Sequence, residues 1–187
     1  YALGNIPKPS AMVWSNMVCD NTAKSGELIM EMLDIPGFFL DRPFKDSGNE
    51  ITYFTNELQD MITFLEEQSG KKMDWAKLEE TVAHMDKEIQ LVREVNELRK
   101  NIPTPFSPLG FLQLLTVDYL FPGQPEALEY LELLLEELHQ MIKEGKGAVP
   151  NEQFRLMTLF LPPIYLMSHL DKISQQHGAV SVVEPFF

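Results

Sequence analysis

One stretch decides how this chain folds, Ala11-Met12-Val13-Trp14-Ser15-Asn16-Met17-Val18-Cys19-Asp20-Asn21-Thr22. Residues 11–18 are almost all apolar or small, which is typical of a strand covered on both faces. Polar residues follow and predict a loop that opens a helix over about residues 22–33. Cys19 is therefore expected at the carboxyl edge of a sheet, where open α/β folds bind their ligands. It also precedes a helix N-terminus, which favours a thiolate.

The single cysteine has two interpretations. A lone cysteine is most often a small buried hydrophobic residue, so the residue pattern alone slightly favours an inert Cys19. The polar residues 20–25 after it argue against deep burial. A functional thiolate could attack carbon or a disulfide, or bind metal, but one thiolate cannot hold a metal cluster without ligands from elsewhere.

The rest of the chain repeats the strand–helix–strand pattern. A short strand at residues 38–40 completes a right-handed βαβ unit within residues 11–44. A second unit is expected over residues 155–184, with a helix between its strands that ends near Gln176. We therefore predict a single α/β domain over residues 1–187, with a parallel sheet that contains the strands 11–18, 38–40, 155–161 and 179–184.

The middle of the chain predicts a large helical insertion over residues 50–146. Apolar residues recur there at helical spacing, and prolines interrupt the pattern at residues 101–108 and 122–125. Four helices are expected. The first ends near Gly70, the second is long and begins after an N-cap at Asp74, and the last two span about residues 110–119 and 126–143. The apolar stripe after Asp74 is close to heptad spacing, so a coiled-coil partner is an alternative to packing on the same domain.

Composition and motifs exclude several classes of protein. The 187 residues carry 28 acidic and 15 basic side chains and no basic groove pattern, so nucleic acid is not an expected partner. No apolar run approaches the about 20 residues that span a membrane. One cysteine excludes an internal disulfide framework, which fits the reducing cytoplasm. Glycine-rich phosphate loops and a Gly-x-Ser-x-Gly elbow are missing from the sequence, and its four histidines lack metal-ligand spacing.

Both ends of the sequence look cut. The chain begins with Tyr1 rather than Met, and its last residues follow an apolar strand without a closing element. We therefore expect a piece of a longer polypeptide.

Short motifs follow one another in a fixed order along almost the whole chain. They are Asn16-x-x-Cys19, Ile35-Pro36-Gly37-Phe38-Phe39-Leu40-Asp41-x-Pro43-Phe44, Leu65-Glu66-x-x-Ser69-Gly70-Lys71-x-x-Asp74-x-x-x-Leu78, the proline-rich break before Gly110, and Arg155-Leu156 through Gly178-Ala179-x-x-Val182-Val183-Glu184. Their order and spacing resemble the 2-hydroxyacyl-CoA dehydratase and benzoyl-CoA reductase family, of the 2-hydroxyglutaryl-CoA dehydratase D-component type. The first two motifs resemble its β-type subunit more than its α-type.

The resemblance implies a fold and a cofactor. Subunits of this family carry two Rossmann-like domains with a [4Fe-4S] cluster held between them by three cysteines. Cys19 resembles the second of these ligands and is our metal and cofactor candidate. The first ligand is then expected upstream of Tyr1 and the third beyond Phe187, so this sequence departs from the pattern by lacking both. Adjacency alone suggests a supporting role for Asn16, Asp20, Asn21 and Thr22.

The resemblance also implies an activity. An ATP-dependent activator protein passes one electron through the cluster to an acyl-CoA thioester, and the resulting ketyl-type radical allows loss of a 2-hydroxyl group. The reductase branch reduces an aromatic ring instead. The implied partners are a sister dehydratase subunit, the activator and acyl-CoA, in an oxygen-sensitive cytoplasmic enzyme. No catalytic residue is assigned in this sequence.

Three alternatives stay open at this point. The chain could belong to a double-cubane-cluster reductase of the same superfamily that acts on small molecules without CoA. It could be a non-catalytic electron-transfer or scaffolding subunit. It could also be a plain α/β binding module in which the cysteine is buried.

Overall fold

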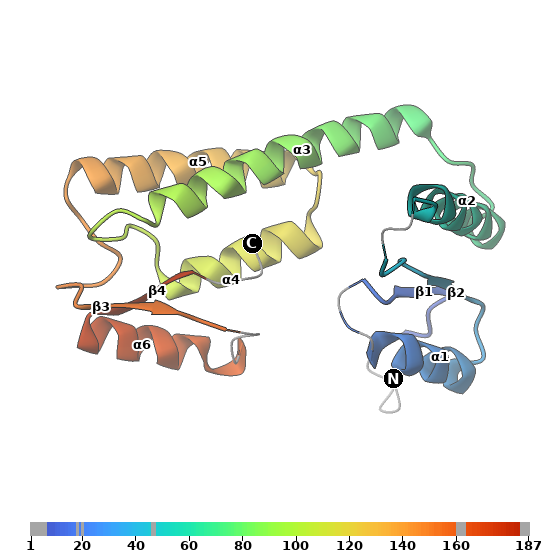
Figure 1. Ribbon diagram of the computed structural model, residues 1–187, viewed down its shortest axis with the longest axis horizontal. Helices are drawn as coiled ribbons and strands as arrows, with labels where there is room; N and C mark the ends of the chain where they lie inside the picture. The colour runs from blue at the N-terminus through green and yellow to red at the C-terminus, as the bar shows by residue number, and fades with distance from the viewer. Residues whose placement is uncertain (1–6, 18, 20, 46–47, 160–163, 184–187) are drawn as a thin grey trace. The chain divides into compact units, whose positions relative to one another are not determined.

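The computed structural model describes residues 7–17, 19, 21–45, 48–159 and 164–183. These residues belong to two compact units, Tyr1–Asp74 and Trp75–Phe187, here called unit 1 and unit 2 (Figure 1). Each unit combines helices with a small parallel sheet. None of the described helices has both the length and the apolar character that a membrane span requires.

Unit 1 is the predicted βαβ unit followed by one long helix. Its elements are β1 (Met12–Ser15), α1 (Asn21–Leu33), β2 (Gly37–Leu40) and α2 (Glu50–Ser69). The two strands are parallel, and their register runs from Met12 opposite Gly37 to Ser15 opposite Leu40.

The packing of unit 1 depends on Trp14. Its indole lies so close to Gly26 of α1 that a side chain at Gly26 would overlap it. The indole N–H also donates to the carbonyl of Ala23, at 3.1 Å. The strand is less covered than the sequence predicts, because the Val13 side chain is 40% exposed.

Unit 2 holds most of the helical insertion and the second βαβ unit. Its elements are α3 (Trp75–Leu98), α4 (Pro108–Leu120), α5 (Pro125–Lys143), β3 (Phe154–Met157), a short 3₁₀ helix η1 (Ile164–Leu166), α6 (Met167–His177) and β4 (Ala179–Val183). Strands β3 and β4 are parallel, with an irregularity between Leu156 and Met157. The core of unit 2 is built from apolar side chains of α3, α4, α5 and the loop before α4: Val92, Val95, Phe106, Phe111, Leu114, Leu131, Leu135 and Leu138.

The α/β class and the parallel pairing of strands are confirmed. The first strand of each βαβ unit ends earlier than expected, β1 at Ser15 and β3 at Met157. Residues 18, 160 and 161 of the predicted strands lie outside the described residues. Each described strand pairs with one other strand, in the orders β1–β2 and β3–β4. One Rossmann-like sheet of four strands, and a single domain over residues 1–187, stay predictions.

Candidate functional site

The parallel pairing of β1 and β2 brings two loops to the same edge of their sheet. The loop after β1 carries Cys19, and the loop after β2 carries Asp41 and Arg42. The sequence analysis placed Cys19 at such an edge, and its Asn-x-x-Cys and Asp-x-Pro-Phe motifs meet there.

Asn16 joins the two loops through all of its side-chain hydrogen-bonding groups. Its Oδ1 accepts the backbone N–H of Arg42 at 2.7 Å. Its Nδ2 donates to Oδ1 of Asp41 at 2.7 Å and to the carbonyl of Arg42 at 3.2 Å. The asparagine amide therefore replaces the backbone pairing that would continue the strand, which explains why β1 stops at Ser15.

Asp41 extends this contact to α2. Its Oδ2 accepts the phenolic O–H of Tyr53 at 2.9 Å. The hydrogen bond to Asp41, followed by partial desolvation and the negative charges of Asp41 and Glu57, raises the pKa of Tyr53 above its ordinary value. The phenol is thus held in its protonated, donating form. Tyr53 is not predictable from the apolar pattern of the sequence, because it lies beside the apolar stripe of its helix rather than on it.

Cys19 is exposed, as expected for a thiol that is available for binding, and this does not support the buried alternative. Its backbone carbonyl accepts the N–H of Thr22 at 3.0 Å and the Thr22 hydroxyl at 2.5 Å. The same hydroxyl also reaches the carbonyl of Ser15. Thr22 therefore ties the Cys19 loop to the start of α1, while Asp20 lies outside the described residues.

The described residues supply one free cysteine at this edge, Cys19. No group of three or more His, Cys, Asp or Glu side chains among them could hold a metal ion. An accessible thiolate has the right donor chemistry for one corner of an iron–sulfur cluster, but ligation by Cys19 stays a prediction.

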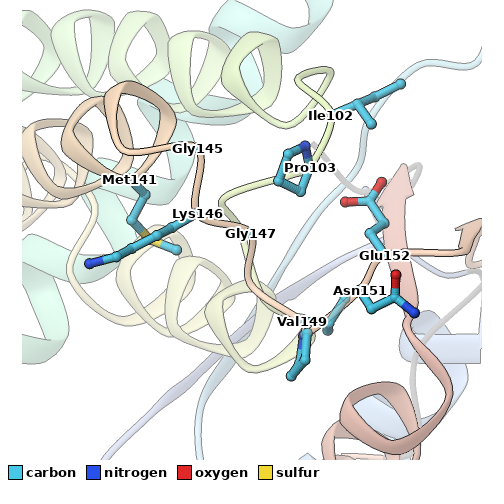
Figure 2. Close-up of a pocket in the computed structure, with 10 residues that line it drawn as sticks. Ile102, Pro103, Met141, Gly145, Lys146, Gly147, Val149, Asn151 and Glu152 are labelled. Atoms are coloured by element: carbon cyan, nitrogen blue, oxygen red, sulfur yellow. The ribbon is translucent and has the colours of Figure 1, made fainter.

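Unit 2 contains a separate pocket of about 480 Å³ that the sequence analysis missed (Figure 2). It lies between the loop at Ile102 and Pro103, the end of α5, and the loop before β3. Its charged groups are already paired, since Lys146 bonds to Glu144 at 2.5 Å and Glu152 bonds to Arg155 at 2.5 Å. We assign this pocket no ligand.

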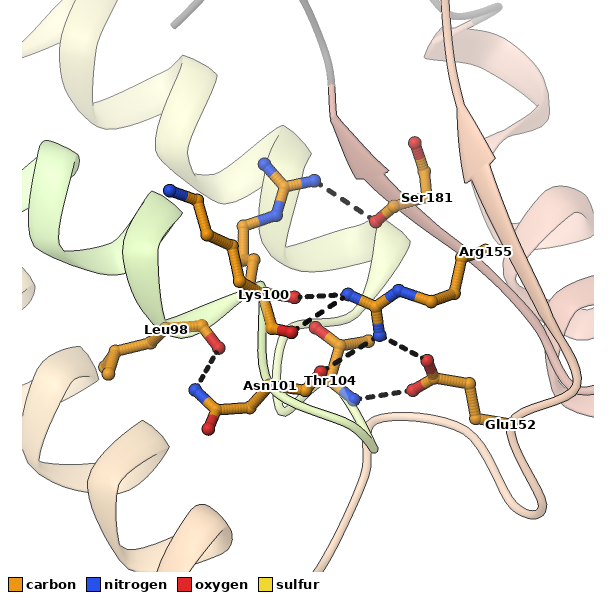
Figure 3. Close-up of polar contacts among 8 residues, drawn as sticks. Leu98, Lys100, Asn101, Thr104, Glu152, Arg155 and Ser181 are labelled. Carbon is orange, nitrogen blue, oxygen red and sulfur yellow. Dashed lines mark hydrogen bonds and ion pairs between the residues drawn. The ribbon is translucent and has the colours of Figure 1, made fainter.

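Arg155 of β3 holds the end of α3 in the same unit (Figure 3). Its guanidinium donates to the carbonyls of Arg99 at 3.0 Å and Asn101 at 2.9 Å, with a longer contact to Lys100 at 3.4 Å. Glu152, whose side chain is only 5% exposed, orients this guanidinium and also accepts the N–H of Thr104 at 2.5 Å. The network joins β3 to the end of α3 and to the loop that follows it.

The fold is α/β, and an exposed cysteine lies at the carboxyl edge of the sheet formed by β1 and β2, the edge at which open α/β folds generally bind ligands. Residues 1–186 match the family described as 2-hydroxyglutaryl-CoA dehydratase, D-component. The chain therefore belongs to this family, as the motifs suggested.

Named relatives agree with this assignment. The chain is 29% identical to the (R)-phenyllactyl-CoA dehydratase alpha subunit of Clostridium sporogenes, over 79% of this chain and 37% of the relative. It is 29% identical to the alpha subunit of the (R)-2-hydroxyglutaryl-CoA dehydratase of Acidaminococcus fermentans, over 87% and 35%. It is 27% identical to a benzoyl-CoA reductase subunit of Thauera aromatica, over 97% and 45%.

The chain thus spans less than half the length of these relatives. Both dehydratase relatives named above are alpha subunits, so they do not support the expected β-type assignment. The type of subunit stays a prediction.

Proposed function

We propose that this chain is part of an iron–sulfur subunit of an (R)-2-hydroxyacyl-CoA dehydratase. Membership of the D-component family carries this proposal. The exposure of Cys19 at the carboxyl edge of β1 and β2 supports it, because a cluster ligand must be accessible to the cluster.

In this proposal Cys19 provides one thiolate ligand to a [4Fe-4S] cluster, and the other ligands come from residues outside this sequence. The cluster would supply one low-potential electron for removal of the 2-hydroxyl group from an acyl-CoA substrate. The protein's own task is to hold and orient the thiolate and to set its surroundings. Thr22 contributes through its bonds to the carbonyls of Ser15 and Cys19.

The proposed partners follow from the same family. Relatives named as alpha subunits imply a sister subunit, and we propose an ATP-dependent activator and a cytoplasmic location as well. A subunit of a benzoyl-CoA reductase is the second candidate, because the match to the Thauera aromatica reductase covers 97% of this chain. Turnover of a 2-hydroxyacyl-CoA, compared with reduction of benzoyl-CoA, separates the two activities.

Anaerobic purification of the full-length protein tests the role of Cys19. Wild-type protein should be brown, with a broad visible charge-transfer band, whereas Cys19→Ser should lose most of its iron and of this band. The physical reason is that a serine alkoxide is a harder and far more basic donor than a thiolate. Met17→Leu, an exposed neighbour in the same loop, is the matched control and should keep both. A Cys19→Ser protein with wild-type iron content and wild-type turnover would remove Cys19 from the mechanism.

A further inference from the structure

We infer that Asn16 is the positioning residue of the Cys19 loop. It acts with Asp41 and Tyr53 as a hydrogen-bonded clamp, called here the Asn16–Asp41–Tyr53 clamp, across the carboxyl edge of β1 and β2. Through Asp41 and Tyr53, the clamp connects the residue that follows β1 to helix α2.

The residue type at position 16 is set by three hydrogen bonds. An asparagine amide offers two donors and an acceptor, and the Asn16 side chain uses each of them, toward Asp41 and both backbone groups of Arg42. Aspartate has the same shape but no donor, and it would face the carboxylate of Asp41. Only an amide of this length can make all three hydrogen bonds without a shift of either loop.

The clamp reaches Cys19 through a short chain of contacts. Tyr53 holds Asp41, and Asp41 holds Asn16. Asn16 directly follows Ser15, and the single O–H of Thr22 is shared between the carbonyls of Ser15 and Cys19. Releasing Asn16 therefore frees the loop at one end, between the last residue of β1 and the first turn of α1.

The meaning of this clamp rests on the proposed function, in which the direction of the Cys19 thiolate matters to a cluster. Whether the clamp exists does not depend on the proposed function, because the order of the loop can be measured in protein without a cluster. Amide hydrogen exchange reports such local opening segment by segment.

We would compare amide exchange of full-length, cluster-free wild-type protein with that of Asn16→Asp, reading peptides that cover residues 17–22 and 41–45. Loss of the donated bonds should accelerate exchange in both segments about tenfold. Asn56→Asp, an exposed change on α2, is the charge-matched control and should leave both segments unchanged.

A swapped double variant gives the sharper test. In Asn16→Asp/Asp41→Asn the introduced amide can donate to the introduced carboxylate and still accept from Tyr53, whereas the bond to the Arg42 carbonyl stays lost. Exchange in both segments should therefore be slower than in Asn16→Asp, though still faster than in wild type. Tyr53→Phe, which removes a single hydroxyl group, covers the case in which Asn16→Asp fails to fold. It should accelerate the same two segments less strongly.

Two results would overturn the inference. In one, residues 41–45 exchange faster while residues 17–22 do not, so that Asn16 holds only the loop after β2. In the other, the swapped variant exchanges like Asn16→Asp. Neither result bears on cluster binding by Cys19, which is decided by the iron content of Cys19→Ser.

Discussion

Glu88 is a buried carboxyl group. It lies on α3 with 2% of its surface exposed. Its Oε2 accepts the N–H of Gly123 at 2.9 Å, whereas Oε1 has no hydrogen-bond partner among the described residues. Burial raises the pKa of Glu88, and the negative charge of Asp118 adds to the shift. The side chain anchors the turn between α4 and α5, where Gly123 has a φ of 68°.

The raised pKa has a defined consequence for stability. Because folded protein binds this proton more tightly than the unfolded chain, the stabilisation from Glu88 is complete at acidic pH and is lost as the pH rises above the ordinary value of 4.5. Glu88→Gln keeps an acceptor for Gly123 and does not titrate. Relative to wild type, its free energy of unfolding should therefore rise as the pH increases from 4.5 towards neutrality, measured by urea denaturation. Glu79→Gln, exposed on the same helix, is the control; parallel pH profiles for wild type and Glu88→Gln would contradict the prediction.

The candidate site was partly predictable from the sequence at the level of residues. The apolar run before Cys19 was enough to place the thiol at a sheet edge, because strand polarity fixes where the chain leaves the sheet. The clamp was not predictable, since Tyr53 meets Asp41 across twelve residues and through the packing of α2. The polar residues after Cys19 correctly predicted its exposure, whereas the general tendency of a lone cysteine to be buried did not.

At the scale of elements, the contact between β3 and the end of α3 is made through one side chain, Arg155. Three carbonyls that follow the last turn of α3 point at the guanidinium of Arg155. A cation there also opposes the negative end of the helix dipole. The guanidinium thereby holds the strand against the end of the helix.

Arg155→Lys tests this arrangement. A lysine keeps the charge but cannot donate in a planar fork to several carbonyls and to Glu152 at once. We expect the free energy of unfolding to fall by about 2 kcal/mol, measured by urea denaturation of the full chain. Arg93→Lys, an exposed change on α3, should cost much less. Equal losses in the two variants would show that Arg155 contributes only its charge.

Helix boundaries were predictable because local chemistry sets them. Gly70 and Gly178 adopt left-handed conformations just after α2 and α6, and Pro125 opens α5. Ser107 accepts the N–H of Gly110, so α4 begins at Pro108, slightly earlier than predicted. Strand lengths were less predictable, because the side chain of Asn16 competes with the backbone pairing that an apolar run alone would extend.

At the scale of the whole molecule, the two units differ in their apolar cores. Within the described part of unit 1, Ile35 and Leu40 are the buried apolar residues besides Gly26. The remaining buried apolar residues all belong to unit 2. The long helix α2 has no buried residue, so its apolar stripe adds little to a core in unit 1.

Limited trypsin digestion should therefore leave unit 2 as the resistant fragment. Lys71 and Lys72 are exposed between α2 and α3, where a protease can bind the chain without unfolding a helix. Cleavage there should produce a fragment that begins at Met73 and persists, while unit 1, with few buried apolar contacts, is degraded at least several-fold faster. N-terminal sequencing and intact mass identify the products, and Lys71→Gln/Lys72→Gln should remove this cut. Two fragments that persist and co-elute would instead support the single domain that the sequence predicts, because each unit would then be protected by the other.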